Sequence, residues 1–246
     1  MSAWSITDTQ SHIAGCFGES QLERVSPSLY AMAQRQVYAR YHFQEVRRLL
    51  TSFQSLYLAD KPLMIVAHGQ DEMAKDAFQT LMLETGAHAL ASVLSIHAIA
   101  DVTSFAVYQA LGFGLRPGAL RNRDISATKI QPELRRTPGH EAISDILNKL
   151  LSDSSFKHVS ALANHSKHQG LIKPMLNEDW TGERKQRHEL RFAAFEHDGN
   201  PFPERELTSL LEPAYNLASR TVVDVGNQIN TILQQNSGSA SFTRRQ

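Results

Sequence analysis

Apolar residues recur at three- and four-residue spacing over most of the chain, which is the repeat of an amphipathic α-helix. Five segments carry this spacing: residues 27–58, 72–113, 141–151, 156–172 and 204–235. Pro27 suits an early helical position after Ser26 as a cap, and Pro62 follows the first segment. The pattern therefore predicts several helices, of which the segment from residue 27 to 58 forms a long one.

The period changes near residue 189. Residues 189–196 have the apolar content of a strand, and Asp198-Gly199 is a common turn pair between two strands. A small β-hairpin is therefore expected near residues 188–203. Together the segments predict a mostly α fold, a helical bundle with a small accessory β-hairpin.

The distribution of glycine, proline and small polar residues predicts the domain limits. Residues 1–26 contain Gly15 and Gly18 and are expected to be irregular, and residues 236–246 read as a disordered polar tail. Residues 115–139, with three prolines, resemble a linker. The helical segments between these ends predict a single helical-bundle domain over residues 27–235.

Composition adds limits on the class of protein. The 246 residues are 41% apolar and 20% charged, with a formal net charge of zero, so no general attraction to nucleic acid or anionic lipid is implied. The single cysteine excludes an intramolecular disulfide, and residues 1–10 lack the pattern of a secretory signal. His88, His97 and Asp101 interrupt the most apolar segment, so we expect a cytoplasmic protein that does not enter a membrane.

Two predicted helices carry polar groups within apolar surroundings. Residues 87–113 place His97, Asp101, Ser104 and Tyr108 on one helical face, and residues 156–172 place Asn164 and His168 four apart, with Lys167 beside them. Buried polar groups are costly unless they are paired, so these two stripes are expected to face each other. Asp101 in particular is expected to be buried and hydrogen-bonded to another helix.

These residues are the candidate catalytic groups: His97, Asp101, Asn164, Lys167 and His168. An aspartate can steady an imidazole in one tautomer, a lysine can hold a phosphate, and a histidine titrates near neutral pH. An asparagine can orient a substrate, because its amide both donates and accepts. The alternative is that both stripes are hydrogen bonds between helices.

Signatures of other sites are absent from the sequence. It contains no HExxH, CxxC, GxSxG, GxGxxG or P-loop pattern, so we expect no metal ion and no cofactor. The linker-like segment is basic, and its arginines are candidates for nucleic-acid contact, although a solvated loop explains them as well. The candidates are Arg121, Arg123, Arg135 and Arg136.

The order of these motifs resembles the HEPN superfamily of small helical bundles, in particular an uncharacterised bacterial branch with an Asn-x-x-Lys-His segment. The matching pieces are His97-x-x-x-Asp101, Asn164-His-Ser-Lys167-His168, the segment ELRFAAFEHDGNPFP and the helix containing VGNQIN. Many members carry an Arg-polar-x(4–6)-His motif. Here Asn164 stands in place of that arginine, while Arg35 to His42 and Arg191 to His197 have the loose spacing.

The resemblance implies a metal-independent ribonuclease of a toxin or defence system. Its ligand would be RNA, and its partner a second copy of the chain or a cognate antitoxin-type protein. His168 would act as general acid or base and Lys167 would hold phosphate. The alternative is a non-enzymatic helical binding module in a defence or regulatory complex.

Overall fold

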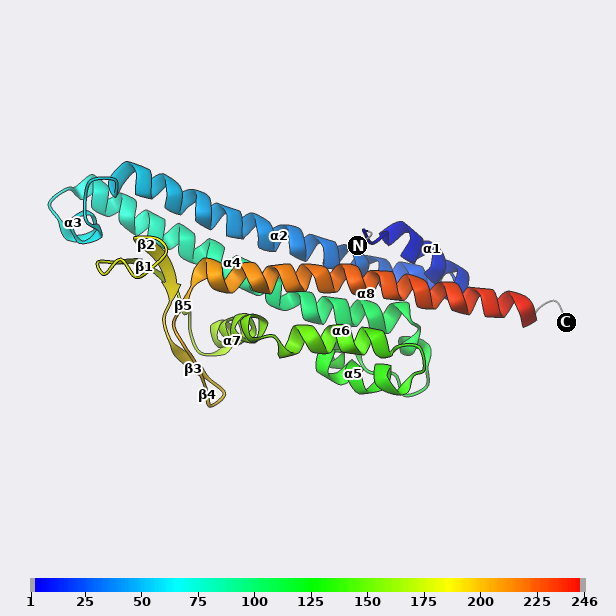
Figure 1. Cartoon of the computed structure of the whole chain (residues 1–246). Helices are drawn as coiled ribbons and strands as arrows, with labels where there is room; N and C mark the ends of the chain where they lie inside the picture. Colours follow the sequence, from blue (N-terminus) through cyan, green and yellow to red (C-terminus); the bar gives the residue numbers. More distant parts are fainter. Residues whose placement is uncertain (1–2, 244–246) are drawn as a thin grey trace. The chain divides into compact units, whose positions relative to one another are not determined.

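The computed structural model describes residues 3–243. It is 72% helical, and the described residues form eight α-helices and a small antiparallel sheet. The mostly α prediction with an accessory hairpin is confirmed (Figure 1). The helices are α1 (Ile6–Phe17), α2 (Glu19–Tyr57), α3 (Leu63–His68), α4 (Glu72–Ala110), α5 (Ala127–Arg136), α6 (Glu141–Ser152), α7 (Ser154–His168) and α8 (Leu207–Thr243). The strands are β1 (Pro174–Glu178), β2 (His188–Phe192), β3 (Phe195–His197), β4 (Asn200–Phe202) and β5 (Arg205–Glu206).

The chain divides into two compact units, whereas the sequence predicts one domain over residues 27–235. The first unit comprises Met1–Gln36, Ile96–Phe156 and Asn216–Gln246, and the second comprises Val37–Ser95 and Lys157–Tyr215. The boundaries fall inside α2, α4, α7 and α8. Helical periodicity runs through such boundaries without a break, so it carries no signal for them.

In the first unit, α1 packs on the later part of α8. The Thr9 hydroxyl donates to the Asn230 side chain at 2.6 Å, and the Trp4 indole N–H donates to Thr9 at 2.8 Å. The Trp4 ring lies directly against Gly226, where an added Cβ would come within 2.3 Å of it. Gly226 is therefore required by close approach of the indole to the helix backbone.

The prediction that residues 1–26 are irregular is wrong. Ser5 caps α1 by accepting from the backbone N–H of Asp8, and Gly18, whose φ of 84° favours glycine, follows Phe17 as the cap at the other end. The helix α2 then begins at Glu19, and Pro27 lies inside it. An interior proline costs about 3 kcal/mol. Buried Val25 and Leu29 on either side of it supply packing that offsets this cost.

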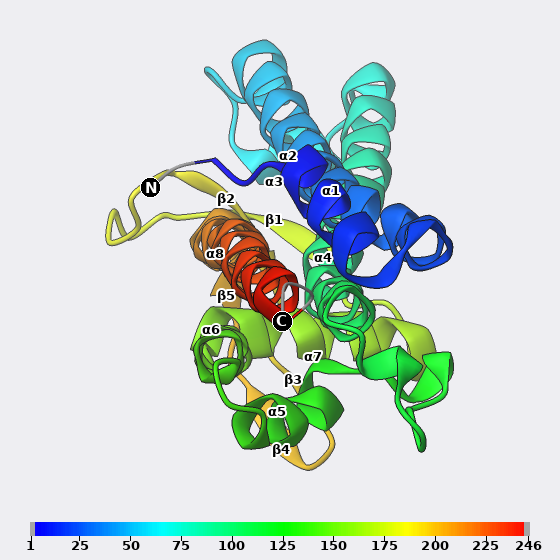
Figure 2. The same cartoon turned by 90° about the vertical axis from the view of Figure 1, so that its right-hand side faces the viewer.

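The linker-like segment is also more ordered than the sequence predicts. It contains two short 3₁₀ turns, Phe113–Leu115 and Asn122–Asp124, followed by α5. Ile130 and Leu134 are buried on one side of α5, which packs beside α6 (Figures 1 and 2). Proline usually ends a helix, yet Pro132 lies inside α5, on the exposed side of the helix.

In the second unit, α2 and α4 lie side by side in opposite directions and are joined through α3 (Figure 1). The Ser92 hydroxyl donates to the Ala39 carbonyl, and the rings of Phe53 and Phe78 lie 6.1 Å apart. The helix α4 is continuous through Gly86 and is long and apolar enough to cross a membrane by length and composition. However, 56% of its most apolar window is buried inside the structure, as in a core helix.

Two small antiparallel β elements complete the second unit. The first is a three-stranded sheet in the order β1-β2-β5, in which Glu178 pairs with His188 and Phe192 pairs with Arg205. The strand β1 is absent from the sequence prediction. The second is the β3–β4 hairpin, which turns at Asp198 (φ 50°) and Gly199 (φ 72°), so the predicted turn is correct.

The last helix is longer than predicted. It runs unbroken past Pro213 to Thr243, and so includes most of the segment for which the sequence predicts a disordered tail. Residues 244–246 of that predicted tail lie outside the described residues.

Candidate functional site

The first predicted polar stripe lies in the first unit and is largely satisfied within it. The Ser104 hydroxyl donates to the Ala100 carbonyl at 2.7 Å, and the Tyr108 hydroxyl accepts the backbone N–H of Leu120 at 2.8 Å. Asp101 is exposed, so the expectation that it is buried and paired is wrong. His97 is half-buried. Short polar side chains inside a helix bond their own helix or the adjacent loop, which a helical repeat does not distinguish from a site.

The second predicted stripe lies in the second unit, at the end of α7. Asn164 is half-buried, while Lys167 and His168 are exposed. His165 Nδ1 lies 2.7 Å from the Gly170 carbonyl and closes the helix end. A small apolar pocket of about 240 Å³ lies where α4 meets the residues just after α7. Its lining residues are Met82, Leu83, Gly86, Ala87, Leu90, Leu171, Ile172 and Lys173.

The basic residues of the linker-like segment are partly neutralised. Arg121 pairs with Asp124 at 2.6 Å and Arg135 pairs with Asp145 at 3.1 Å. Arg123 and Arg136 are exposed. The four arginines therefore form a weaker basic surface in the first unit than their number in the sequence predicts.

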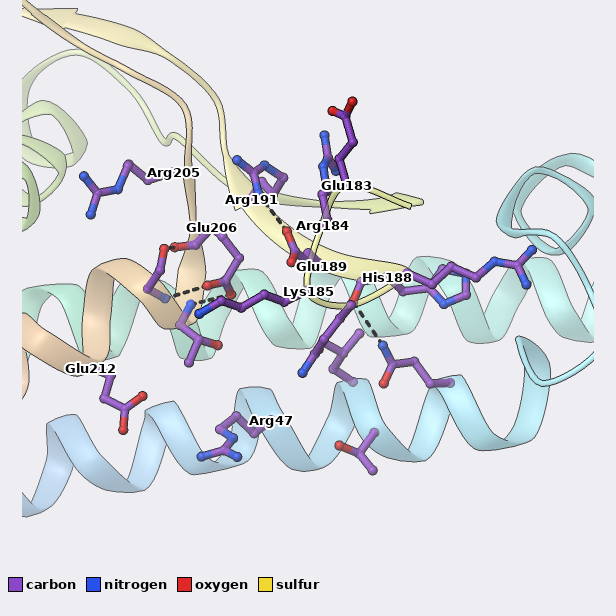
Figure 3. Close-up of a pocket in the computed structure, with 17 residues that line it drawn as sticks. Arg47, Glu183, Arg184, Lys185, His188, Glu189, Arg191, Arg205, Glu206 and Glu212 are labelled. Atoms are coloured by element: carbon purple, nitrogen blue, oxygen red, sulfur yellow. Dashed lines mark hydrogen bonds and ion pairs between the residues drawn. The ribbon is translucent and has the colours of Figure 1, made fainter. Parts of the chain in front are cut away.

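A larger cavity is an open cleft of about 880 Å³ in the second unit, here called the charged cleft. It is bounded by α2, the β1–β2 loop (residues 179–187), β2 and the start of α8 (Figure 3). Ten charged residues and one histidine line it: Arg47, Glu183, Arg184, Lys185, Arg187, His188, Glu189, Arg191, Arg205, Glu206 and Glu212.

Several of these charges are held in structural interactions. The guanidinium of Arg191 pairs with Glu189 at 2.7 Å and also with Glu204. Glu206 caps α8 by accepting the backbone N–H groups of Thr208 and Ser209, at 2.6 and 2.5 Å. These groups fix the wall of the cleft and have little capacity left for a ligand.

Apart from Arg187, which pairs with Glu178, the remaining charges of the cleft have no ion pair within the part of the chain that the structure describes. They are four cations, Arg47, Arg184, Lys185 and Arg205, and two carboxylates, Glu183 and Glu212. In Figure 3, Lys185 extends from the β1–β2 loop toward the start of α8, with Arg47 on α2 and Glu212 on α8 beyond it. The unpaired groups leave the cleft with an excess of positive charge, which suits an anionic ligand.

A buried carboxylate anchors the β1–β2 loop beside this cleft. The Glu178 side chain is only 4% exposed and lies 2.8 Å from Arg187 Nη2 and 3.3 Å from His188 Nε2. It also accepts the backbone N–H of Leu63 at 2.8 Å, and Gln54 donates to the His188 carbonyl. Glu178 therefore ties together β1, β2 and the start of α3.

The β1–β2 loop is ordered by Asp179. The hydroxyl of Thr181 and the backbone N–H groups of Arg184 and Thr181 donate to its carboxylate, and these bonds lower its pKa to about 2. The backbone N–H of Asp179 donates to the Arg187 carbonyl across the loop. Beside it, the indole of Trp180 is 67% exposed, with Arg187 over its ring at 5.3 Å.

Histidines gather at two other places in the second unit. His158 on α7 packs edge-to-face against Phe195 and Phe202 of the β3–β4 hairpin, at 5.4 and 5.2 Å. It is 3% exposed, and burial, together with the charge of Arg205, lowers its pKa to about 4.

Between α2 and α4, Nδ1 of His42 lies 2.8 Å from Nδ1 of His88. Burial and the neighbouring His88 lower the pKa of His42.

Among the described residues, no group of three or more His, Cys, Asp or Glu side chains could hold a metal ion. No known family model, curated protein or solved structure matches this chain. Function is therefore inferred from the geometry of the second unit.

The charged cleft is not among the sites that the sequence predicts. Arg47 is one of several arginines on the first long helix, and its position there does not distinguish it from the others. The available signal is the segment DWTGERKQR, in which one tryptophan precedes three basic residues between two apolar segments. The strand β1 before it is too short and irregular in pattern to be predicted, so the sequence does not define this segment as a loop between strands.

Proposed function

We propose that the second unit is a nucleic-acid-binding module that holds backbone phosphates in the charged cleft. The observation that carries this proposal is the excess of cations without an ion pair there, four against three carboxylates, one of which, Glu206, is held as the cap of α8. Lysine and arginine side chains that are free of ion pairs bind phosphate oxygens and release counterions from the nucleic acid. The alternative reading of the sequence, a non-enzymatic binding module, is the one that this cleft supports.

The order of the cleft walls also supports the proposal. Arg191, Glu189 and Glu206 are already held by partners, so they fix the wall of the cleft without competing strongly for a ligand. Arg47 comes from a long helix, while Arg184 and Lys185 come from a loop that Asp179 orders. Cations held on ordered segments lose less conformational entropy when they bind a phosphate.

The test is fluorescence anisotropy with a labelled RNA of about 12 nucleotides, both as a single strand and annealed as a duplex, at about 50 and 200 mM salt. The double variant Arg47→Ala/Lys185→Ala should weaken binding of both probes by at least about 10-fold. It should also reduce the dependence of affinity on salt. For the single strand, the slope should fall by about 0.7 for each phosphate that the variant no longer neutralises.

The matched control is Arg40→Ala/Lys157→Ala, which removes the same two charges from exposed positions of the second unit outside the cleft. This control should bind both probes as the unaltered protein does. Equal losses in the two double variants would show a general charge effect and would refute the cleft. No binding of either probe at the lower salt concentration would refute the proposal outright.

A second candidate is the ribonuclease activity that the resemblance implies. The accessibility of Lys167 and His168, both exposed in the last turn of α7, favours it. His168→Ala should then reduce RNA cleavage by about 10²–10⁴-fold, the usual contribution of a general acid or base. A chelator should leave cleavage unchanged, and His68→Ala, at another exposed histidine, should have no effect. Absence of cleavage of any RNA pool would end this candidate and leave the binding module.

A further inference from the structure

We infer that the exposed indole of Trp180 is a stacking platform for an unpaired base, so that the module prefers single-stranded nucleic acid. This inference rests on the proposed function, since it gives the cleft a class of ligand. It starts from the position of Trp180 in the β1–β2 loop, the same loop that supplies Arg184 and Lys185 to the charged cleft. A base on the indole and its phosphates on the loop cations would be parts of one ligand.

The indole has a cation over its ring and is otherwise largely exposed. Arg187 lies over the ring at 5.3 Å, and Arg187 is itself held by Glu178, through Nε at 2.9 Å and Nη2 at 2.8 Å. Glu178 is buried, so its position is set by the fold. With Arg187 on one face, 67% of Trp180 is still exposed to a ligand.

The loop around Trp180 is ordered by its own bonds. Asp179 accepts from Thr181 and from the backbone N–H of Arg184, at 2.7 to 2.9 Å, and so closes the loop immediately after Trp180. The exposed ring leaves apolar area in contact with water. Burying it against a base would remove that area from water at little cost in entropy.

The combination of aromatic and basic groups selects one class of nucleic acid. In a duplex the bases are already stacked on each other, so a protein ring can reach only the terminal pair, whereas a single strand presents free base faces. The cleft cations bind the phosphates of either form. The indole therefore distinguishes the two forms, and Trp180 is the specificity-determining residue.

The experiment uses the full chain and the same two RNA probes. Trp180→Ala should weaken binding of the single strand by about 5- to 100-fold, the usual loss of one base stack, and leave the affinity for the duplex nearly unchanged. Trp180→Phe should retain part of the affinity for the single strand, because a smaller aromatic ring still stacks. Tyr38→Ala is the control, since Tyr38 is a half-exposed aromatic residue elsewhere in the second unit.

A second readout uses tryptophan fluorescence. The chain has two tryptophans, Trp4 and Trp180. The single strand should quench the emission of the unaltered protein and of Trp4→Phe, but not that of Trp180→Phe. This measurement reports contact with the indole itself, and a thermal melt of each variant shows whether it is folded.

The outcomes separate the inference from the proposed function. Binding of both probes with no effect of Trp180→Ala, or with an equal loss for both, would overturn the stacking platform and leave phosphate binding in the cleft. Quenching that persists in Trp180→Phe would overturn it as well. Failure of the unaltered protein to bind either probe would overturn both proposals.

Discussion

The two β elements of the second unit bury polar side chains in opposite ways. In the β1-β2-β5 sheet, the buried Glu178 carboxylate pairs with Arg187 and accepts the backbone N–H of Leu63, while His188 Nε2 lies 3.3 Å from it without a hydrogen bond. At the β3–β4 hairpin, His158 is buried against Phe195 and Phe202, and its Nε2 has no hydrogen-bond partner among the described residues. The sheet stabilises a charge by pairing it, whereas the hairpin excludes the charge by surrounding the imidazole with rings.

The paired groups of the sheet lie at the wall of the charged cleft. Pairing fixes Arg187 and Arg191 at the wall and allows neighbouring cations to remain exposed to solvent. An aromatic cluster instead covers the side chain that it contacts.

Acidification should lower the free energy of unfolding through the buried His158 at the hairpin, and this is the largest effect on stability that we expect. The pKa of His158 falls from 6.5 to about 4 on folding, so the unfolded chain binds more protons between these values. The contribution of His158 to the free energy of unfolding is therefore complete above pH 6.5. It decreases as the pH falls through this range and changes no further below about 4. The loss amounts to at most about 3 kcal/mol.

The measurement is urea unfolding at a series of pH values. In His158→Phe the ring packing is retained and the titrating group is removed, so the decrease in stability on acidification should be smaller by the contribution of His158. His68→Ala, at an exposed position, serves as the control and should follow the unaltered protein. A pH dependence identical in His158→Phe and the unaltered protein would contradict this account of the hairpin.

Removal of the Glu178 carboxylate, the buried acceptor of the sheet, should lower the free energy of unfolding. Glu178→Ala leaves the backbone N–H of Leu63 without its acceptor and releases Arg187, which should cost about 1–3 kcal/mol. The free energy of unfolding at neutral pH measures this loss. Glu183→Ala removes an exposed glutamate from the same loop and should change stability by less than about 0.5 kcal/mol. Similar values for the two variants would mean that pairing does not stabilise the sheet.

The smallest effect should come from the free cations. Arg47→Ala and Lys185→Ala should each change the free energy of unfolding by less than about 0.5 kcal/mol, because neither side chain has an ion pair in the described residues. Thermal melts at low and moderate salt measure this. A loss comparable with that of Glu178→Ala would show that these cations are structural rather than available to a ligand.

The helices can be predicted from the sequence because each buries one side at a regular spacing. Residues Ile143, Leu147 and Leu150 of α6 are an example, spaced four and three apart and all buried. The helix limits are less predictable. Pro27, Pro132 and Pro213 all lie inside helices, because packing of neighbouring apolar residues outweighs the local cost of proline.

The site is less predictable than the fold. Polar residues at helical spacing, such as Ser104 and Tyr108, predict a site, but they bond within their own unit. The charged cleft depends instead on which arginines are paired, and pairs such as Arg191 with Glu204 join residues of different strands and loops. A single sequence gives the number of charges in a segment but not their partners.

The close contact of α1 with α8 has a consequence for the order of folding. Thr9 and Asn230 are 221 positions apart, and Trp4 lies on Gly226. During synthesis, α1 is therefore made long before the helix that it packs against, and the hydroxyl of Thr9 is without its native acceptor, Asn230, in that interval. Closing so large a loop is slow and opposed by chain entropy, so docking of α1 belongs to a late step of folding.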